Sequence, residues 1–362
     1  MLIQGKNSNI SHVLNHLNIG KDVDGELLKT TFKELFTRKD VIARDTQLGA
    51  ILSGIMAKTP SVEEVTSLIN VALSLDSFQV IDLKQNITDP IICVAGSGKK
   101  GVKTINISTP ASIVAASAGA FVVKPGSHST SSVTGSSDFM ISLGLKIKDV
   151  HSTIEVLKNT GLGFFSIEDL IPTFDSVYGK KIFAPNPLSF GLAALVCPVK
   201  YTKLVYGLSH YNIKLSASVL SNFGIRDAII STCTDDHLRY IDEFGLFKHN
   251  YYLFLKDSSV GEVQKMNPIQ EIGVPPYSTN DVCSARTAKE NIKCSLDVLK
   301  GRGKKAHEDI IALNSGVILL MADKVSNLQE GYEASIEHIR NGRALQKLKE
   351  VILASGGDVK FI

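Results

Sequence analysis

The sequence lacks the features by which several classes of protein are recognised. Its five cysteines are scattered, without a CxxC pair or a histidine partner at zinc-ligand spacing, so we interpret them as reduced thiols. No apolar run reaches bilayer length, and the first residues do not combine a basic segment with an apolar stretch. With 44% hydrophobic and 21% charged residues, and no polar low-complexity run, the chain is predicted to fold compactly. We therefore expect a cytoplasmic protein that does not enter a membrane.

An excess of charge of one sign is also missing. Lys and Arg total 39 against 36 Asp and Glu, which leaves a formal net charge of +3. So small an excess argues against nucleic acid as a partner. Local basic clusters remain, and a solvated surface is the alternative to a binding role for them; they are Lys99, Lys100 and Lys103, and Arg302, Lys304 and Lys305.

Hydrophobic periodicity divides the chain into two parts. From about residue 24 to 75, apolar residues recur at helical spacing, and Ser61 followed by Glu63 and Glu64 indicates a helix start. From Ile91, strand-length apolar segments alternate with helical ones, before helices return over residues 307–321 and 328–353. We predict an α/β protein. A small all-helical domain is expected over residues 1–85, with part of the 150–190 region packed on it, and a large α/β domain with a mixed, mainly parallel central sheet over residues 86–362.

The segment from Gly96 to Thr109 leaves the first buried strand and enters a helix. Glycines allow backbone N–H groups to approach an anion, and the start of a helix adds unpaired donors. Thr109 is predicted to cap this helix with Pro110 at its first position, while Asn106 and Ser108 offer polar groups on the same edge. The segment therefore suits a phosphate, although a tight turn without a ligand is an equally good interpretation.

Small polar residues follow the next strand. Lys124 stands at the end of that strand, and a run of Ser and Thr hydroxyls extends to Asp138. A loop that hydrogen-bonds phosphate or ribose oxygens needs such hydroxyls, and the lysine adds a point charge. The alternative is a flexible Ser/Thr-rich linker, but the flanking strand and the helix-like residues 139–145 argue against it.

Together these segments resemble the anthranilate phosphoribosyltransferase family. That family carries a Gly-Thr-Gly-Gly-Asp loop, an Asn-Ile-Ser-Thr turn, and then Lys-His-Gly-Asn-Arg followed by Ser-Ser, Gly-Ser and Asp. Residues 106–109 reproduce the turn in full, and the positions that match the third element are Lys124, Gly126, Ser131, Ser132, Gly135, Ser136 and Asp138. The likeness continues through an acidic pair, Asp242 and Glu243, and through the closing helices. It spans nearly the whole chain, although the N-terminal helices match only in pattern.

The resemblance implies a site for phosphoribosyl pyrophosphate (PRPP) and Mg²⁺, and a homodimer formed through the helical parts. Ser108, Asp242 and Glu243 are implied as Mg²⁺ ligands, since this ion prefers a few carboxylates and phosphate oxygens. A solvated turn is the alternative for the acidic pair. The implied reaction is a displacement at the anomeric carbon of ribose, catalysed by positioning and by stabilisation of the departing pyrophosphate, with Lys124 as the candidate catalytic residue. The residues implied in donor binding are Gly96, Ser97, Gly98, Lys100, Asn106, Ser108, Thr109, Lys124, Gly126, Ser131 and Ser132.

The chain departs from the family pattern where the acceptor is held. The family's Gly-Asp is Lys99-Lys100 here, and its His-Gly-Asn-Arg is replaced by residues 125–128, which leaves His128 as a polar substitute. The family's histidine and arginines that hold the anthranilate carboxylate align with residues 170–178, which contain neither residue type. A carboxylate buried there would be unpaired and costly, so anthranilate is disfavoured. Asn186 and Ser189 join His128 as candidate acceptor contacts, with a rigid Pro-rich turn as the alternative for their segment.

The leading hypothesis is therefore a Mg²⁺-dependent phosphoribosyltransferase whose small nitrogenous or aromatic acceptor is not anthranilate. A pentosyl phosphorylase of the same fold, with Lys99 and Lys100 in a phosphate pocket, is one alternative. A non-enzymatic relative that binds nucleic acid is another. The central structural expectation is that Asp242 and Glu243 lie close to Ser108.

Overall fold

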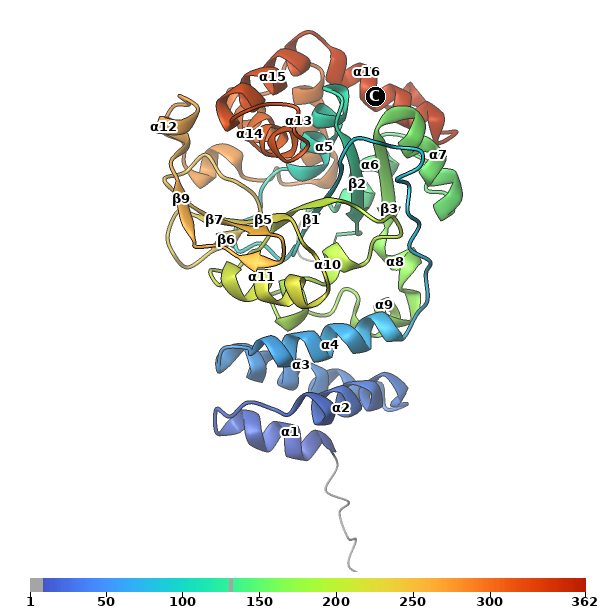
Figure 1. Ribbon diagram of the computed structural model, residues 1–362, viewed down its shortest axis with the longest axis vertical. Helices are drawn as coiled ribbons and strands as arrows, with labels where there is room; N and C mark the ends of the chain where they lie inside the picture. Colours follow the sequence, from blue (N-terminus) through green and yellow to red (C-terminus); the bar gives the residue numbers. More distant parts are fainter. Residues whose placement is uncertain (1–8, 130–132) are drawn as a thin grey trace, which may run out of the picture.

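The protein consists of a layer of helices below a larger α/β body (Figure 1). A computed structural model describes residues 9–129 and 133–362. Helix α4 begins as the sequence predicts, because the Ser61 side chain accepts a hydrogen bond from the Glu64 amide and the Glu64 carboxylate accepts one from the Ser61 amide. The helices of this lower layer are α1 (Asn9–Asn18), α2 (Gly25–Thr37), α3 (Val41–Ala57) and α4 (Val62–Ser74).

A single central sheet forms the core of the α/β body, with the order β3-β2-β1-β4-β5-β7-β8. Strands β1 to β5 pair in parallel, whereas β7 runs antiparallel to β5, so the predicted mixed, mainly parallel sheet is confirmed. Strand β3 has no counterpart in the sequence-based prediction. The strands are β1 (Ile91–Gly96), β2 (Phe121–Gly126), β3 (Leu162–Ser166), β4 (Lys203–Gly207), β5 (Ala228–Thr234), β6 (Tyr240–Ile241), β7 (His249–Lys256), β8 (Ser259–Val260) and β9 (Gln264–Met266).

The central strand β1 has an apolar side chain on each face of the sheet, as a strand covered on both sides requires. Ile92 and Val94 belong to a core cluster with α5 and α14, above the sheet in Figure 1. Ile91, Cys93 and Ala95 belong to the cluster on the other side, which includes the buried residues of the N-terminal helices. The helical layer and the lower face of the sheet therefore share one continuous apolar core.

The helices of the α/β body cover both faces of the sheet. The C-terminal stretch that was expected as one helix over residues 328–353 is two helices, because Gly342 adopts a left-handed conformation (φ 83°) between them. The helices are α5 (Ser108–Ser117), α6 (Ser136–Ser142), α7 (Val150–Thr160), α8 (Ile167–Leu170), α9 (Pro172–Tyr178), α10 (Leu192–Leu195), α11 (Ile213–Asn222), α12 (Pro268–Glu271), α13 (Ala288–Leu299), α14 (Lys305–Met321), α15 (Leu328–Arg340) and α16 (Arg343–Ala354). Short 3₁₀ turns span Pro187–Phe190, Thr279–Val282 and Val359–Phe361.

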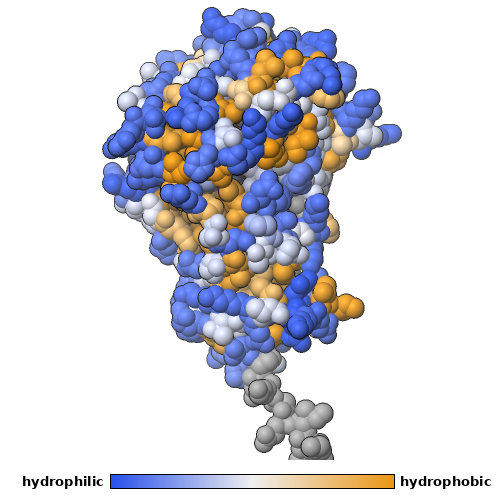
Figure 2. All heavy atoms as spheres, turned by 90° about the vertical axis from the view of Figure 1, so that its right-hand side faces the viewer, coloured by the Kyte–Doolittle hydropathy of each residue, from blue (hydrophilic) through white to orange (hydrophobic). Residues whose placement is uncertain are grey.

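The segment between β3 and β4 joins the helical layer to the sheet. Phe174 of α9 stacks on Phe36 of α2 with 5.5 Å between ring centroids, and the turn Pro187–Phe190 contacts α3 and α4. On the face turned by 90° in Figure 2, hydrophobic residues continue from the body down to the helical layer. The division into domains at residue 85 remains a prediction. Within the described residues, no helix has the length and apolar character needed to cross a bilayer.

Candidate active site

A pocket lies at the carboxyl edge of the parallel strands. Strand β2 pairs with β1 on one side, and β4 pairs with β1 on the other. The order in which successive strands are added to the sheet therefore changes direction at β1. Ligands of open α/β sheets bind in the crevice that such a reversal creates. Gly96 at the end of β1 and Lys124 to Gly126 at the end of β2 line this pocket.

The glycine loop after β1 approaches the pocket in a conformation that favours glycine. Gly98 and Lys99 have φ of 63° and 60°, in the left-handed region. The helix after the loop starts earlier than expected, since α5 begins at Ser108 with Ile107 in the cap position, so the prediction of Thr109 as cap was wrong. No side chain caps this helix. Its first turn is therefore left for another partner, as at helix starts that bind anions.

Lys124 is buried beside this loop. Its side chain is only 2% exposed, and its ammonium donates a hydrogen bond to the carbonyl of Val94, at 3.2 Å. Burial lowers the pKa of Lys124 to about 8. A buried cation with a single neutral partner destabilises the fold, and an anionic ligand in the pocket would offset this cost.

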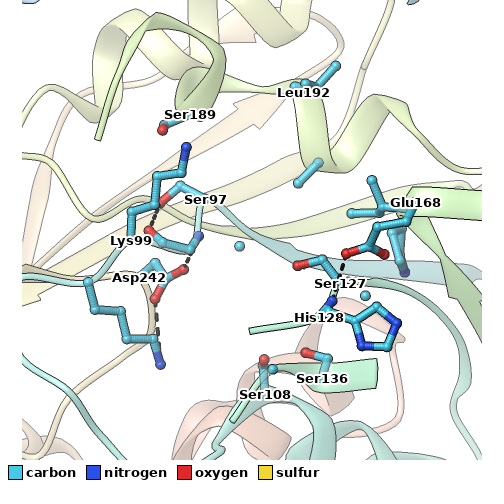
Figure 3. Close-up of a pocket in the computed structure, with 18 of the residues that line it drawn as sticks. Ser97, Lys99, Ser108, Ser127, His128, Ser136, Glu168, Ser189, Leu192 and Asp242 are labelled. Atoms are coloured by element: carbon cyan, nitrogen blue, oxygen red, sulfur yellow. Dashed lines mark hydrogen bonds and ion pairs between the residues drawn. The ribbon is translucent and has the colours of Figure 1, made fainter. Parts of the chain in front are cut away.

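Asp138 organises the polar loop after β2. Its carboxylate accepts hydrogen bonds from the amides of Ser129 (2.8 Å) and Gly135 (2.9 Å), and its other oxygen lies 2.7 Å from Nδ1 of His128. Although burial opposes the effect, these donors hold the pKa of Asp138 below its usual range. The loop thereby presents Ser127, His128 and Ser136 to the pocket (Figure 3).

The acidic pair returns to the same edge of the sheet through the short strand β6, which pairs with β5. Asp242 and Glu243 are 6% and 7% exposed, and both line the pocket together with Ser108. The three residues also line a second, smaller pocket beneath the first. The carboxylates therefore do not face bulk water, and they line the same two pockets as Ser108.

Two groups of the glycine loop contact the acidic pair. The Gly98 amide donates to Asp242 Oδ2 at 2.7 Å, and Lys100 Nζ lies 2.6 Å from Glu243 Oε2 and 3.6 Å from Asp242 Oδ1. Although burial opposes the effect, the carboxylates of Glu243 and Asp242 raise the pKa of Lys100. Burial raises the pKa of Glu243 to about 7, with Lys100 opposing it. A lysine ammonium thus partly neutralises two buried acids.

Several buried polar atoms around this pocket have no hydrogen-bond partner among the described residues. They are Asn106 Oδ1, Asp242 Oδ1 and Glu243 Oε2 of the lining, the last two with the Lys100 ammonium as their only ionic neighbour among the described residues, and Thr109 Oγ1 and Ser137 Oγ beside residues of the lining. Unsatisfied buried oxygens are rare in folded proteins and indicate a ligand or an ion. Two carboxylates and a serine hydroxyl on one wall suit Mg²⁺, which binds few protein oxygens and completes its shell with phosphates. The residues therefore fit the metal, with Lys100 as a competing cation.

The part of the pocket formed by α8, α9 and the turn Pro187–Phe190 is mainly apolar. Two sets of polar residues border it, one on each wall. On one wall, Lys99 Nζ donates to the Tyr178 hydroxyl, and the Asn186 amide donates to the same hydroxyl at 2.8 Å. Burial lowers the pKa of Lys99 to about 7. On the other wall, Glu168 accepts a hydrogen bond from the His128 amide at 2.7 Å. Figure 3 shows Glu168 and His128 on one side, facing Ser97, Lys99 and Asp242 on the other.

Most of the residues predicted for the site line this pocket. Thr109 and Asn186 do not line it: Thr109 is 1% exposed, and Asn186 lies behind Tyr178. Ser131 and Ser132 lie outside the described residues. The pocket-lining residues that were predicted are Gly96, Ser97, Gly98, Lys100, Asn106, Ser108, Lys124, Gly126, His128, Ser189, Asp242 and Glu243.

The pocket also includes side chains that the sequence analysis did not select. Glu168 and Asp175 come from α8 and α9, and Tyr178 ends α9. One signal was available for them: acidic residues follow a short apolar run that ends at Ser166, as expected for the carboxyl end of a strand.

A family model described as the α/β domain of a glycosyl transferase family matches residues 88–345, more than half of the chain. The anthranilate phosphoribosyltransferase of Petrotoga mobilis is 30% identical over 319 residues, which cover 85% of this chain and 86% of that protein. The chain belongs to the anthranilate phosphoribosyltransferase family. The resemblance seen in the motifs is thereby confirmed, and so is the coarse activity class, a phosphoribosyltransferase.

Solved structures of this family share the fold. The enzyme of Thermus thermophilus superposes with a TM-score of 0.76 at 19% identity, over 95% of this chain and 99% of that one. The Saccharomyces cerevisiae enzyme, in complex with PRPP and Mg, superposes with a TM-score of 0.78 at 17% identity, over 96% and 98% of the two chains. The helical layer and the α/β body are thus arranged as in this family.

Proposed function

We propose that the protein transfers the 5-phosphoribosyl group of PRPP, with Mg²⁺, to a small nitrogenous or aromatic acceptor other than anthranilate. The observation that carries the donor side is the convergence of four segments on one pocket: the glycine loop, the start of α5, Lys124 and the acidic pair. PRPP and Mg are bound by the yeast relative, which supports both as ligands here.

In this proposal, Ser108, Asp242 and Glu243 hold Mg²⁺. When bound, the ion would neutralise charge on the departing diphosphate. Lys124 and the uncapped first turn of α5 add positive potential on the same side, where the leaving group gains charge as its bond to the anomeric carbon breaks. The acceptor nitrogen forms the new bond to that carbon, so no covalent enzyme intermediate is needed.

The exclusion of anthranilate is based on charge. No arginine lines the pocket among the residues that the structure describes, and the segment expected to replace the family's histidine and arginines contributes Ile171, Phe174, Asp175 and Tyr178. A benzoate carboxylate would meet the like charges of Asp175 and Glu168, which Lys99 and Lys180 of the same pocket oppose only in part. The curated relatives are named for anthranilate, so this part of the proposal needs its own test.

Calorimetry with PRPP and Mg²⁺ tests the donor side. Saturable binding is expected in the wild type and its loss in the double variant D242A/E243A. The matched control is E262A, an exposed acid paired with Lys214 at the surface, which should bind PRPP like the wild type. If the wild type shows no binding, or if the double variant binds equally well, the donor assignment is refuted.

Pyrophosphate release tests the acceptor side. Anthranilate should give no more than background release, and turnover of anthranilate at the rate of the best acceptor would refute its exclusion while leaving the transferase intact. Release of free bases from nucleosides and phosphate, without PRPP binding, would instead establish the phosphorylase alternative.

We further propose that the protein forms a homodimer through the helical layer. Ile19, Val41 and Ile42 of that layer are 67%, 52% and 83% exposed, which is unusual for large apolar side chains and is typical of interfaces. Light scattering should give twice the chain mass, and I42D should give a monomer. A monomeric wild type at high concentration would refute the dimer.

A further inference from the structure

The proposed acceptor end of the pocket has a mainly apolar lining, here called the chamber. Ile171, Phe174 and Leu188 are 1%, 2% and 2% exposed, and Leu192 closes the chamber at the top of Figure 3. Such a chamber favours a planar ring. The few polar groups at its border must therefore determine which planar ring binds most tightly.

Glu168 is the acidic member of that border. Its Oε1 accepts a hydrogen bond from the His128 amide at 2.7 Å, and within residues 9–129 and 133–362 the carboxylate also accepts a long one from the Ser166 hydroxyl, at 3.4 Å, and interacts with its own backbone amide. A carboxylate offers about four lone-pair positions, so a position remains for a ligand. In Figure 3 the carboxyl group of Glu168 points towards Ser127 and the backbone of His128.

No cation of the described chain forms an ion pair with Glu168 or with its neighbour Asp175 within 4 Å. Burial raises the pKa of both carboxyl groups. Unpaired, partly buried carboxylates are destabilising, and a ligand that donates N–H hydrogen bonds removes that cost. They also repel a ligand that carries its own carboxylate.

Two lysines line this end of the pocket besides the acids, and the charge of one of them, Lys180, opposes that of Asp175. The other candidate for holding a carboxylate is Lys99, on the opposite wall. Its ammonium is already bound to the Tyr178 hydroxyl and lies over the same ring, 4.4 Å from the centroid. Since burial lowers its pKa to about 7, about half of the population is neutral near that pH. Lys99 is therefore a weak counterion for a carboxylate. The negative charge of Glu168 on the other wall then decides whether a ligand that carries a carboxylate can bind in the chamber.

We propose that Glu168 selects the acceptor, which is a planar ring without a carboxylate that donates an N–H hydrogen bond to Glu168. The inference rests on the proposed transferase function and names the chemical class of its second substrate. The Glu168 carboxylate accepts the hydrogen bond of the ring or amino nitrogen, and the apolar chamber stacks against the ring faces.

Two ligands of the same shape test this proposal. 2-Aminobenzamide and anthranilate share the ring and the amine, and differ only in an N–H donating amide against a carboxylate. Their affinities are measured by calorimetry on protein saturated with Mg²⁺ and pyrophosphate, where no transfer occurs. The wild type is expected to bind 2-aminobenzamide at least about tenfold more tightly, since like charges at a partly buried site cost as much as a hydrogen bond to a charged group.

The variant E168Q keeps the acceptor for the His128 amide but loses the negative charge, so it is expected to fold and to reduce the tenfold preference to about unity. The matched control is D169N, an exposed acid on the next position of α8, which should keep the preference. Equal or tighter binding of anthranilate by the wild type, an unchanged preference in E168Q, or binding of neither ring would each overturn the proposal. Anthranilate binding that is lost in K99M would assign the selection to Lys99 instead, and would also overturn it.

The donor titration separates this proposal from the function on which it rests. PRPP with Mg²⁺ should bind the wild type, E168Q and D169N equally. Absence of PRPP binding in the wild type refutes the transferase function. Normal PRPP binding together with the wrong ligand preference refutes only the role of Glu168.

Discussion

Replacing Lys100 by methionine should increase the affinity of the donor-free protein for divalent cations. Lys100 Nζ lies 2.6 Å from Glu243 and 3.6 Å from Asp242, so it holds the position that a metal ion would share. Each unit-charge pair at about 4 Å is worth about 4 kcal/mol at an effective dielectric constant of about 20. Methionine keeps most of the side-chain volume but leaves both carboxylates without this competitor.

The expected gain is smaller than the full Coulomb energy, because the ion must lose water before it binds. About 2 to 3 kcal/mol is a realistic share, which corresponds to an affinity about 30- to 140-fold higher, since about 1.4 kcal/mol is a factor of ten. Electron paramagnetic resonance of free Mn²⁺ measures this without PRPP. The titration is run from pH 8 upwards, because burial raises the pKa of Glu243 to about 7, loss of Lys100 raises it further, and a protonated carboxyl is a poor ligand.

K214M is the control, since Lys214 is exposed and pairs with Glu262 at the surface. It should leave the Mn²⁺ affinity within about twofold of the wild type, as surface charge changes contribute little. Unchanged or weaker Mn²⁺ binding by K100M would show that the lysine does not compete with the metal, and the reasoning about this loop would be wrong.

Three further predictions concern stability and are measured by urea unfolding. K124M should stabilise the protein by about 3 kcal/mol at pH 7, because burial lowers the pKa of Lys124 to about 8. The stability difference between K124M and the wild type should shrink as the pH rises from about 8 to 10.5, because in this range the folded wild type has released the proton that its unfolded state still binds. A stability difference that does not change with pH would contradict the burial argument. G207A should cost about 3 kcal/mol or more and abolish PRPP binding, because its Cβ would lie 1.5 Å from the Asp242 carbonyl oxygen, whereas G49A, with open space around it, should be neutral or stabilising. E64A should cost about 3 kcal/mol, because Lys58 keeps only the exposed Asp22 as an ionic partner and the amides of Val23 and Ser61 lose their acceptor. E26A, which breaks an exposed pair, should cost less than about 1 kcal/mol. Similar losses in both variants would show that burial of the first pair is unimportant.

The sequence by itself determined the parts of the protein that depend on neighbouring residues. The capping box of Ser61 and Glu64 and the apolar run of β1 are short-range patterns, and the structure has them where the sequence predicts them. The turn of residues 106–109 was recognised because its four residues are contiguous. Even among local features the helix start at Ser108 was missed, since Pro110 suggested a first position two residues later.

Only the tertiary structure decided which distant residues meet. Asp242 reaches the Gly98 amide across 144 positions of sequence because β6 folds back on β5, and the sequence contains no local signal for that return. Glu168 faces the chamber because β3, which was not predicted, ends at the same edge of the sheet as β1 and β2. Strand order and register set these distances, and they are fixed by the packing of the whole sheet rather than by any short segment. The family motif therefore led to the proposed donor site, whereas the charge around the proposed acceptor chamber followed only from the assembled fold.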